Sequence, residues 1–265
     1  MMPLRVGAVS YLNSRPLIEG LAGRPDRFVV RTDIPSTCAA LLHDAAIDVG
    51  LIPSIEYLQR PDYQIVPGVA VASRGEVASV ALFTARPIHD VRSIALDTSS
   101  RTSAALLRVL CARRFRIEPR WQAAAPELET MRRMADAALL IGDPALFADY
   151  TAAGLEKIDL GIEWAAMTGL PFVWACWVGR AGAVAPDAVR ALQAARDAGL
   201  AALPAIAREF AGPDDQKAAF VYSYLRDNIQ YSLGPDELNG LRRFYDEAGA
   251  LGIRPHADEL RFYDV

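Results

Sequence analysis

A cluster of hydroxyl residues around one arginine lies in the segment LDTSSRTSAALLRVL, residues 96–110. It separates a short apolar run from a clean helical pattern, and hydroxyls together with free backbone N–H groups at a helix start form an anion site. A capping cluster without a ligand is the alternative, but capping needs one hydroxyl and this segment holds five. The lysine of a P-loop is missing, which favours a carboxylate over a phosphate. The predicted binding residues are Ser100, Arg101, Thr102 and Ser103.

Polar residues also follow the first three predicted strands. The stretch VSYLNSRPL places Ser10, Asn13, Ser14 and Arg15 after the first one, and Ser54 follows the third. Residues 32–36 form a similar polar segment after the second. Ordinary capped loops explain each segment taken alone. Together they predict a polar rim at one end of a sheet, with Ser10 and Ser54 among its ligand contacts and Arg15 on the solvated side.

Two further segments carry candidate ligand contacts. In ALLIGDPAL a buried strand turns at Gly142 and Asp143, where the carboxylate could cap the next helix, orient neighbouring groups or accept a hydrogen bond from a ligand hydroxyl. In TGLPFVWACW, Phe172 and Trp174 alternate onto one face of a strand. Either ring could wall a cleft beside a cyclic ligand, although core packing is the more common fate of such residues. Phe172 is the predicted contact.

The elements that must position these residues alternate between strand and helix. Strand-like runs at 4–9, 27–34 and 47–53 are separated by helical patterns, which predicts a parallel sheet with crossover helices. Ligands of such sheets bind outside the carboxyl ends of the strands. Antiparallel strands around Ser73–Gly75 follow, then a second α/β unit, and then helices that Pro204 should interrupt.

These patterns predict an α/β protein of two lobes with a central ligand cleft. Lobe one is expected to comprise residues 1–86 and 178–265, with C-terminal helices packed on it. Lobe two is expected to comprise residues 87–177, inserted into lobe one.

The composition argues against two classes of binding partner, nucleic acids and membranes. A net charge of -4 with no basic run argues against nucleic acid. No apolar run is long enough to span a bilayer and the first residues lack a signal-peptide pattern, so we expect a cytoplasmic protein without membrane contact. The oligomeric state stays open.

The cysteines and histidines show no pattern of a disulfide or metal site. The scattered Cys38, Cys111 and Cys176 fit buried thiols. The isolated histidines, one of them His256, predict no metal, and no nucleotide motif predicts a cofactor.

With these motifs placed, the chain resembles the chorismate dehydratases of the futalosine route to menaquinone. The matching segments occur in the order of that family and span about two-thirds of the chain; they read VGAVSYLNSRPL, IDVGLIPSIEYL, ASVALFT, ALDTSSRTSAALL, LLIGDPAL and TGLPFVWACW. The resemblance implies a type II periplasmic-binding-protein fold used as an enzyme. It also implies loss of water from chorismate to give 3-[(1-carboxyvinyl)oxy]benzoate. At Asp97–Ser99 we expect smaller residues in some relatives of this family. Which hydroxyl of the loop contacts the ligand therefore stays open.

The resemblance also implies roles for single residues. The family's active-site asparagine and serine match Asn13 and Ser79, its carboxylate-binding loop matches Ser100–Ser103, and its Gly-Asp turn matches Gly142 and Asp143. The enolpyruvyl carboxylate of the substrate would take the ring proton, held by Asn13 and Ser79. Three alternatives remain: the dihydroxynaphthoate synthase of the same route, a non-catalytic binding protein for a small carboxylate, and the effector-binding half of a transcription regulator.

Overall fold

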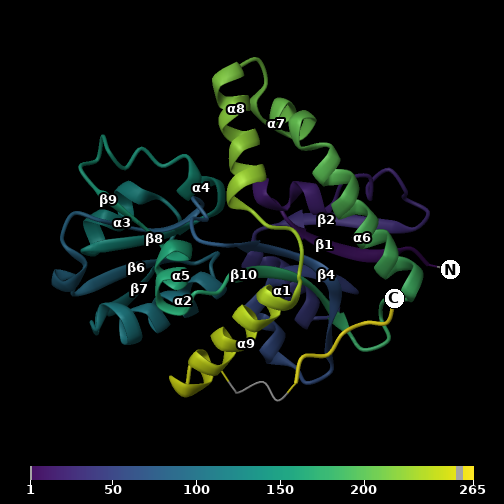
Figure 1. Ribbon diagram of the computed structural model, residues 1–265, viewed down its shortest axis with the longest axis horizontal. Coiled ribbons are helices and arrows are strands. Elements are labelled where there is room, and N and C mark those ends of the chain that lie inside the picture. The colour runs from purple at the N-terminus through teal and green to yellow at the C-terminus, as the bar shows by residue number, and fades with distance from the viewer. Residues whose placement is uncertain (1, 255–258) are drawn as a thin grey trace.

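Two five-stranded sheets form the framework of the protein in the computed structural model, which describes residues 2–254 and 259–265. His256 lies outside the described residues. Each sheet is flanked by helices, so the molecule has two lobes side by side (Figure 1). The N-terminus and the C-terminus both lie on the side of the first sheet. The predicted α/β class with two lobes is therefore confirmed.

The first sheet combines parallel and antiparallel neighbours. Its first three strands run parallel, as the strand–helix alternation predicts, and β10 runs antiparallel to both of its neighbours. All residues of the central third strand are buried, because helices or the second lobe cover both faces. The spatial order is β2 (Phe28–Asp33), β1 (Leu4–Val9), β3 (Val49–Pro53), β10 (Phe172–Arg180) and β4 (Tyr63–Ser73).

The second sheet has the same mixed character. Its first three strands are parallel, and an antiparallel fourth strand separates them from the edge strand. The order is β7 (Arg120–Ala124), β6 (Ser93–Asp97), β8 (Ala137–Ile141), β5 (Val80–Thr84) and β9 (Glu156–Asp159). The carboxyl ends of β6 and β8 place the predicted anion loop and the Gly-Asp turn at one edge.

The chain passes between the lobes at other positions than predicted. β5 pairs with β8 and β9 in the second sheet, so the first crossing lies between Ser73 and Val80 and not near residue 86. β10 belongs to the first sheet, so the return lies before Phe172 and not near residue 178. Residues 73–75 do not form the predicted hairpin, because β4 and β5 belong to different sheets. The segment that joins them contains positive φ values at Gly75 and Ala78. A strand pattern in the sequence does not indicate in which of the two sheets the strand will pair.

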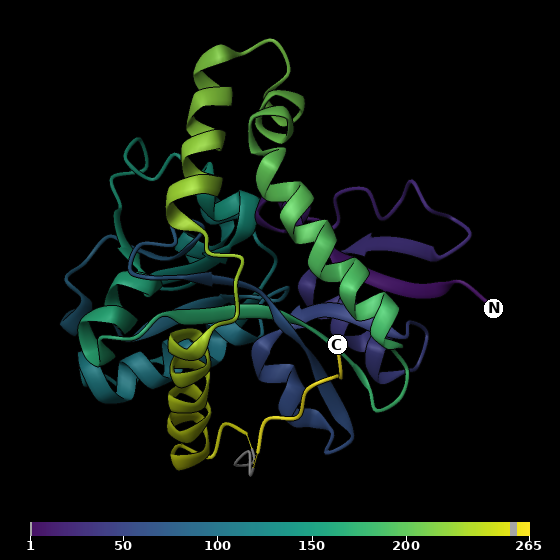
Figure 2. The same cartoon turned by 45° about the vertical axis from the view of Figure 1, so that its right-hand side comes forward.

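Helices cover both sheets and extend beyond them. α7 and α8 stand above the sheets and α9 lies below, as two views agree (Figures 1 and 2). The expected break at Pro204 is confirmed, since α6 ends at Ala201 and Pro204 lies in the first turn of α7. The α-helices are α1 (Pro35–His43), α2 (Thr102–Leu110), α3 (Leu128–Met134), α4 (Gly142–Leu146), α5 (Leu160–Thr168), α6 (Pro186–Ala201), α7 (Leu203–Ala211), α8 (Asp215–Ser223) and α9 (Pro235–Ala250).

Short 3-10 and π turns carry several of the chemically interesting residues. The helix expected after the first strand is a short 3-10 helix, because Pro16 and Gly20 interrupt a longer one. Gly199 of α6 packs against it so closely that a Cβ would overlap the Pro16 carbonyl. The 3-10 helices are η1 (Leu12–Leu17), η2 (Ser54–Gln59) and η3 (Ile88–Asp90), and the π turns are η4 (Cys111–Phe115) and η5 (Tyr224–Asn228).

A buried ion pair holds η2 in place beside the predicted site. The Glu56 side chain is 5% exposed, and its carboxylate lies 2.8 Å from His43 Nε2 and accepts a hydrogen bond from Arg254 Nη2 at 2.9 Å. Burial acts to raise the pKa of Glu56, but the hydrogen bond with His43 and the charge of Arg254 outweigh it and lower that pKa. The ionised form therefore stabilises the folded state.

Replacing Glu56 with glutamine should lower the free energy of unfolding by about 2 kcal/mol near pH 7. Because the folded-state pKa is lowered, this stabilisation is full above the unfolded pKa near 4.5 and is lost as pH falls through the folded value. The difference between wild type and variant should shrink below pH 4.5 in urea titrations followed by tryptophan fluorescence. Glu19→Gln, at an exposed position, is the matched control. A pH-independent difference would contradict this account.

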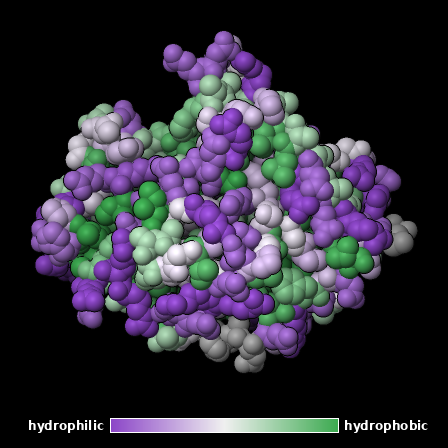
Figure 3. Space-filling model, viewed as in Figure 1, coloured by the Kyte–Doolittle hydropathy of each residue, from purple (hydrophilic) through white to green (hydrophobic). Residues whose placement is uncertain are grey.

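The surface in Figure 3 mixes hydrophilic and hydrophobic residues without a single dominant apolar area on that face. Within the described part of the chain, none of the helices combines the length and apolar composition needed to cross a bilayer.

Candidate functional site

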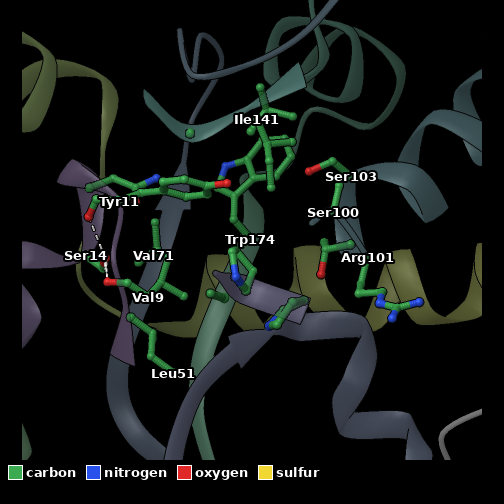
Figure 4. A pocket seen from close by; sticks show the side chains of 17 residues that line it. Val9, Tyr11, Ser14, Leu51, Val71, Ser100, Arg101, Ser103, Ile141 and Trp174 are labelled. Atoms are coloured by element: carbon green, nitrogen blue, oxygen red, sulfur yellow. Dashed lines mark hydrogen bonds between the residues drawn. The ribbon is translucent and has the colours of Figure 1, made fainter. Parts of the chain in front are cut away.

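A small cavity of about 60 Å³ lies between the two sheets. Strand ends and loops of both lobes form its walls (Figure 4). Apolar side chains make up most of the lining, and no Asp, Glu, His or Lys of the described residues contributes to it. The polar groups in the wall are hydroxyls, an amide and one guanidinium: Tyr11, Asn13, Ser14, Ser100, Arg101, Thr102 and Ser103.

The predicted anion loop forms one end of this cavity. Thr102 and Ser103 open α2, where the first backbone N–H groups have no partner within the helix. The Thr102 hydroxyl accepts a hydrogen bond from Ile55 N at 3.2 Å, so it is used to join the lobes. Ser103 is directed towards the cavity in Figure 4, whereas Arg101 is directed away from Tyr11. The buried Ser100 Oγ has no hydrogen-bond partner among the described residues. Ser100 and Ser103 thus remain available to an anion.

Replacing Ser103 with alanine should lower kcat/KM for the substrate proposed below by about tenfold. The variant loses one hydrogen bond to a charged group, which contributes about 1.5–3 kcal/mol. Thr98→Ala, which removes an exposed hydroxyl of the same loop, should leave kcat/KM unchanged. Steady-state kinetics of both variants tests the assignment, and an unaffected Ser103→Ala enzyme would remove Ser103 from the site.

The first-lobe loop presents Asn13 to the same cavity. The Ser14 hydroxyl can donate to the carbonyl oxygens of Val9, at 2.6 Å, and Tyr11, at 2.7 Å, which fixes the turn after β1. Ser10, by contrast, is exposed and is not part of the lining. Its backbone continues the pairing with β2, since Ser10 N donates to Asp33 O, and this directs its side chain away from the cavity.

Gly142 packs directly against the Tyr11 ring. Gly142 adopts φ +64°, and a Cβ at this position would overlap the Tyr11 ring. The ring hydroxyl lies 3.1 Å from Ser99 Oγ of the second lobe. Beside it, Asp143 Oδ1 accepts a hydrogen bond from Leu12 N at 3.0 Å. Burial raises the pKa of Asp143, although this hydrogen bond opposes the rise. The predicted Gly-Asp turn therefore contacts the first-lobe loop directly.

Ser79 lies behind the cavity wall, directly before β5. Its side chain is fully buried, and it accepts a hydrogen bond of 2.7 Å from the Tyr224 hydroxyl. Its carbonyl accepts from Gly142 N at 2.8 Å. Ser79 itself is absent from the lining, whereas its neighbour Val80 belongs to it. The backbone thus brings Ser79 to the edge of the site, where the Tyr224 phenol bonds to it.

Two residues that were predicted to contact the ligand, Ser54 and Phe172, are instead buried among other residues of the protein. Ser54 is fully buried and donates to Val173 O at 2.8 Å, which ties η2 to β10. Phe172 is 1% exposed and packs against Trp164, Trp174 and Phe244. The helices α5 and α9 cover β10 at this point, so the ring belongs to the core.

Sequence reasoning missed Tyr11 and Tyr224 and chose the wrong one of two aromatic residues. Trp174 lines the cavity in place of Phe172, and its Nε1 donates to Ser73 Oγ at 3.1 Å. Tyr11 stands two residues before Asn13, so its position in the loop was a usable signal. Tyr224 lies in an ordinary helical pattern, and no local signal distinguishes it from a core residue.

The fold and the position of the cavity define the class of the protein. Two mixed sheets with a site between them are the type II periplasmic-binding-protein arrangement. A solved structure from Archaeoglobus fulgidus has a TM-score of 0.74 at 16% identity, covering 95% of this chain and 98% of its own. A Candida albicans protein described as having the generic periplasmic-binding-protein fold has a TM-score of 0.68 at 10% identity, covering 97% and 92%.

Sequence comparison then gives the family. Residues 4–250 match the family described as menaquinone biosynthesis, and the chain belongs to that family. A curated relative, the chorismate dehydratase of Thermus thermophilus, is 32% identical over 271 residues. The alignment covers 96% of this chain and 97% of the relative. The resemblance drawn from the motifs is confirmed.

Proposed function

We propose that this protein is a chorismate dehydratase, a hydro-lyase that converts chorismate into 3-[(1-carboxyvinyl)oxy]benzoate and water. The family and the similarity to the Thermus thermophilus chorismate dehydratase support this assignment. The observation that carries it is the cavity lining, in which neutral hydroxyl and amide donors face apolar walls and none of the described residues adds a carboxylate. Such a lining suits a ring that bears two carboxylates.

The reaction removes one proton and one hydroxide from neighbouring ring carbons. The C–H bond breaks at the carbon that carries the enolpyruvyl ether, its electron pair forms the new ring double bond, and the adjacent C–OH bond breaks with its electrons on oxygen. The hydroxide takes up the proton and leaves as water, and the ring becomes aromatic. The gain in aromaticity means that orientation and modest acid–base assistance suffice.

Each part of the site has a role in this proposal. The start of α2, with Ser100 and Ser103, binds one substrate carboxylate through hydroxyl and backbone N–H groups. Asn13 and Ser79 hold the enolpyruvyl carboxylate, which takes the ring proton. Asn13 is neutral and Ser79 is a weak base, so their role is to orient the carboxylate. Tyr11 and Trp174 flank the ring.

The cavity in this structure is too small for the substrate. Its volume is about 60 Å³, whereas ligand sites usually measure about 300–1,000 Å³. Binding of chorismate therefore requires the lobes to separate along the Tyr11–Gly142 contact. Hinged motion between two lobes is common in folds of this type.

Incubation with chorismate followed by mass spectrometry tests the proposal. The expected product has the mass of chorismate less one water and an aromatic absorption spectrum. Chorismate incubated without protein gives the background of spontaneous decay. Binding without turnover would favour the carboxylate-binding alternative, and neither binding nor turnover would favour the related synthase or another ligand. A cytoplasmic location is part of the proposal, supported by the three free and buried cysteines.

A further inference from the structure

Tyr224 bonds to Ser79, one of the two residues that are expected to act on the substrate. It opens the π turn η5, at the end of α8, and its side chain is 3% exposed. Its hydroxyl donates to Ser79 Oγ at 2.7 Å, across 145 residues of sequence. The Asn13 side chain, like Ser79, acts to lower the pKa of this phenol. Single π turns within helices often occur at functional sites.

The geometry leaves the Ser79 proton without a good acceptor. A serine hydroxyl has one hydrogen to donate, and Tyr224 already occupies an acceptor position on Ser79 Oγ. The remaining contact of Ser79 Oγ, with Val77 O, measures 3.4 Å, well beyond the usual length of about 2.7–2.8 Å for O–H···O bonds. The proton is therefore free to turn towards a carboxylate that enters the site.

The phenol of Tyr224 keeps its own proton at all relevant pH values. Burial raises the pKa of Tyr224 strongly, the charges of Asp143 and Asp159 raise it further, and the hydrogen bonds with Ser79 and Asn13 only partly oppose this. Tyr224 thus acts as a permanent donor to Ser79, and it has no part in proton transfer.

We propose that Tyr224 is a positioning residue: its hydroxyl occupies one acceptor site of Ser79 and so directs the Ser79 proton towards the substrate carboxylate. This inference rests on the proposed dehydratase function. Without the phenol hydroxyl, Ser79 can rotate and donate elsewhere. Tyr224→Phe should therefore lower kcat about tenfold and leave KM for chorismate nearly unchanged, because orientation of Ser79 matters most in the transition state.

A double-mutant cycle separates this role from a merely structural one. Tyr224→Phe should lower kcat in the wild-type background and have no further effect in a Ser79→Ala background. A packing role would reduce kcat by the same factor in both backgrounds. The matched control is Tyr231→Phe, since Tyr231 is equally buried and its hydroxyl has no partner within the described residues. This control should keep wild-type kinetics.

Three outcomes would overturn the inference. These are wild-type kcat in folded Tyr224→Phe, equal losses in both backgrounds, or a loss in Tyr231→Phe as large as that in Tyr224→Phe. Circular dichroism verifies folding, and Tyr224→Met replaces the phenylalanine variant if that variant does not fold. An inactive wild-type protein would contradict the proposed function itself, whereas an active wild type with an unaffected Tyr224→Phe would contradict only the role of Tyr224.

Discussion

Replacing Asn13 with leucine, or Ser79 with alanine, should lower kcat for chorismate dehydration by about 100- to 1000-fold. Both residues are proposed to orient the carboxylate that removes the ring proton, so they act in the transition state more than in ground-state binding. Asn13 lines the cavity, and Ser79 lies at its edge and accepts a hydrogen bond from Tyr224. Chorismate binding should weaken far less than kcat falls, which isothermal titration and steady-state kinetics measure separately.

A purely structural role for these residues predicts a different result. If Asn13 only stabilises the first turn of η1, Asn13→Leu costs about 1 kcal/mol of stability and the folded variant keeps its kcat. Asn239→Leu, at an exposed position of α9, controls for the apolar substitution. Near-wild-type turnover in both folded variants would refute the proposed mechanism and leave a binding protein or a different catalytic pair.

Replacing Gly142 with alanine should lower kcat/KM by about 100-fold, because a displacement of about 1 Å in a catalytic site has an effect of this order. The new Cβ would overlap the Tyr11 ring, so the ring or the whole Gly-Asp turn must move. That turn also positions Ser79, whose carbonyl accepts from Gly142 N. The positive φ adds about 1–2 kcal/mol of strain. Kinetics and thermal unfolding of the purified variant measure both effects.

Gly154→Ala separates strain from crowding. Gly154 has φ +67°, close to that of Gly142, and a Cβ there would meet nothing within 4 Å. This control should lose stability to a similar extent and keep its activity. If Gly142→Ala retains activity as well, the Tyr11–Gly142 contact is unimportant for the reaction and the cavity opens without it.

The sequence by itself determined the class of the fold and the position of several candidate binding groups. The hydroxyl cluster after β6 lies at the start of α2, as its pattern indicates, because strand, loop and helix signals there are all local. The same holds for Asn13 and for the turn at Gly142, whose positive φ favours glycine. Parallel pairing of the first three strands also follows from their alternation with helical segments.

Only the tertiary structure decided which of the polar and aromatic candidates meet at the cavity. Phe172 and Trp174 have the same local pattern, yet helices cover one and the cavity borders the other. The sheet to which β5 belongs, and hence the position of Ser79, depends on pairing with strands that lie far along the chain. The hydrogen bond from Tyr224 to Ser79 spans 145 residues. Such contacts depend on how separate elements pack together, and local sequence patterns carry no information about that packing.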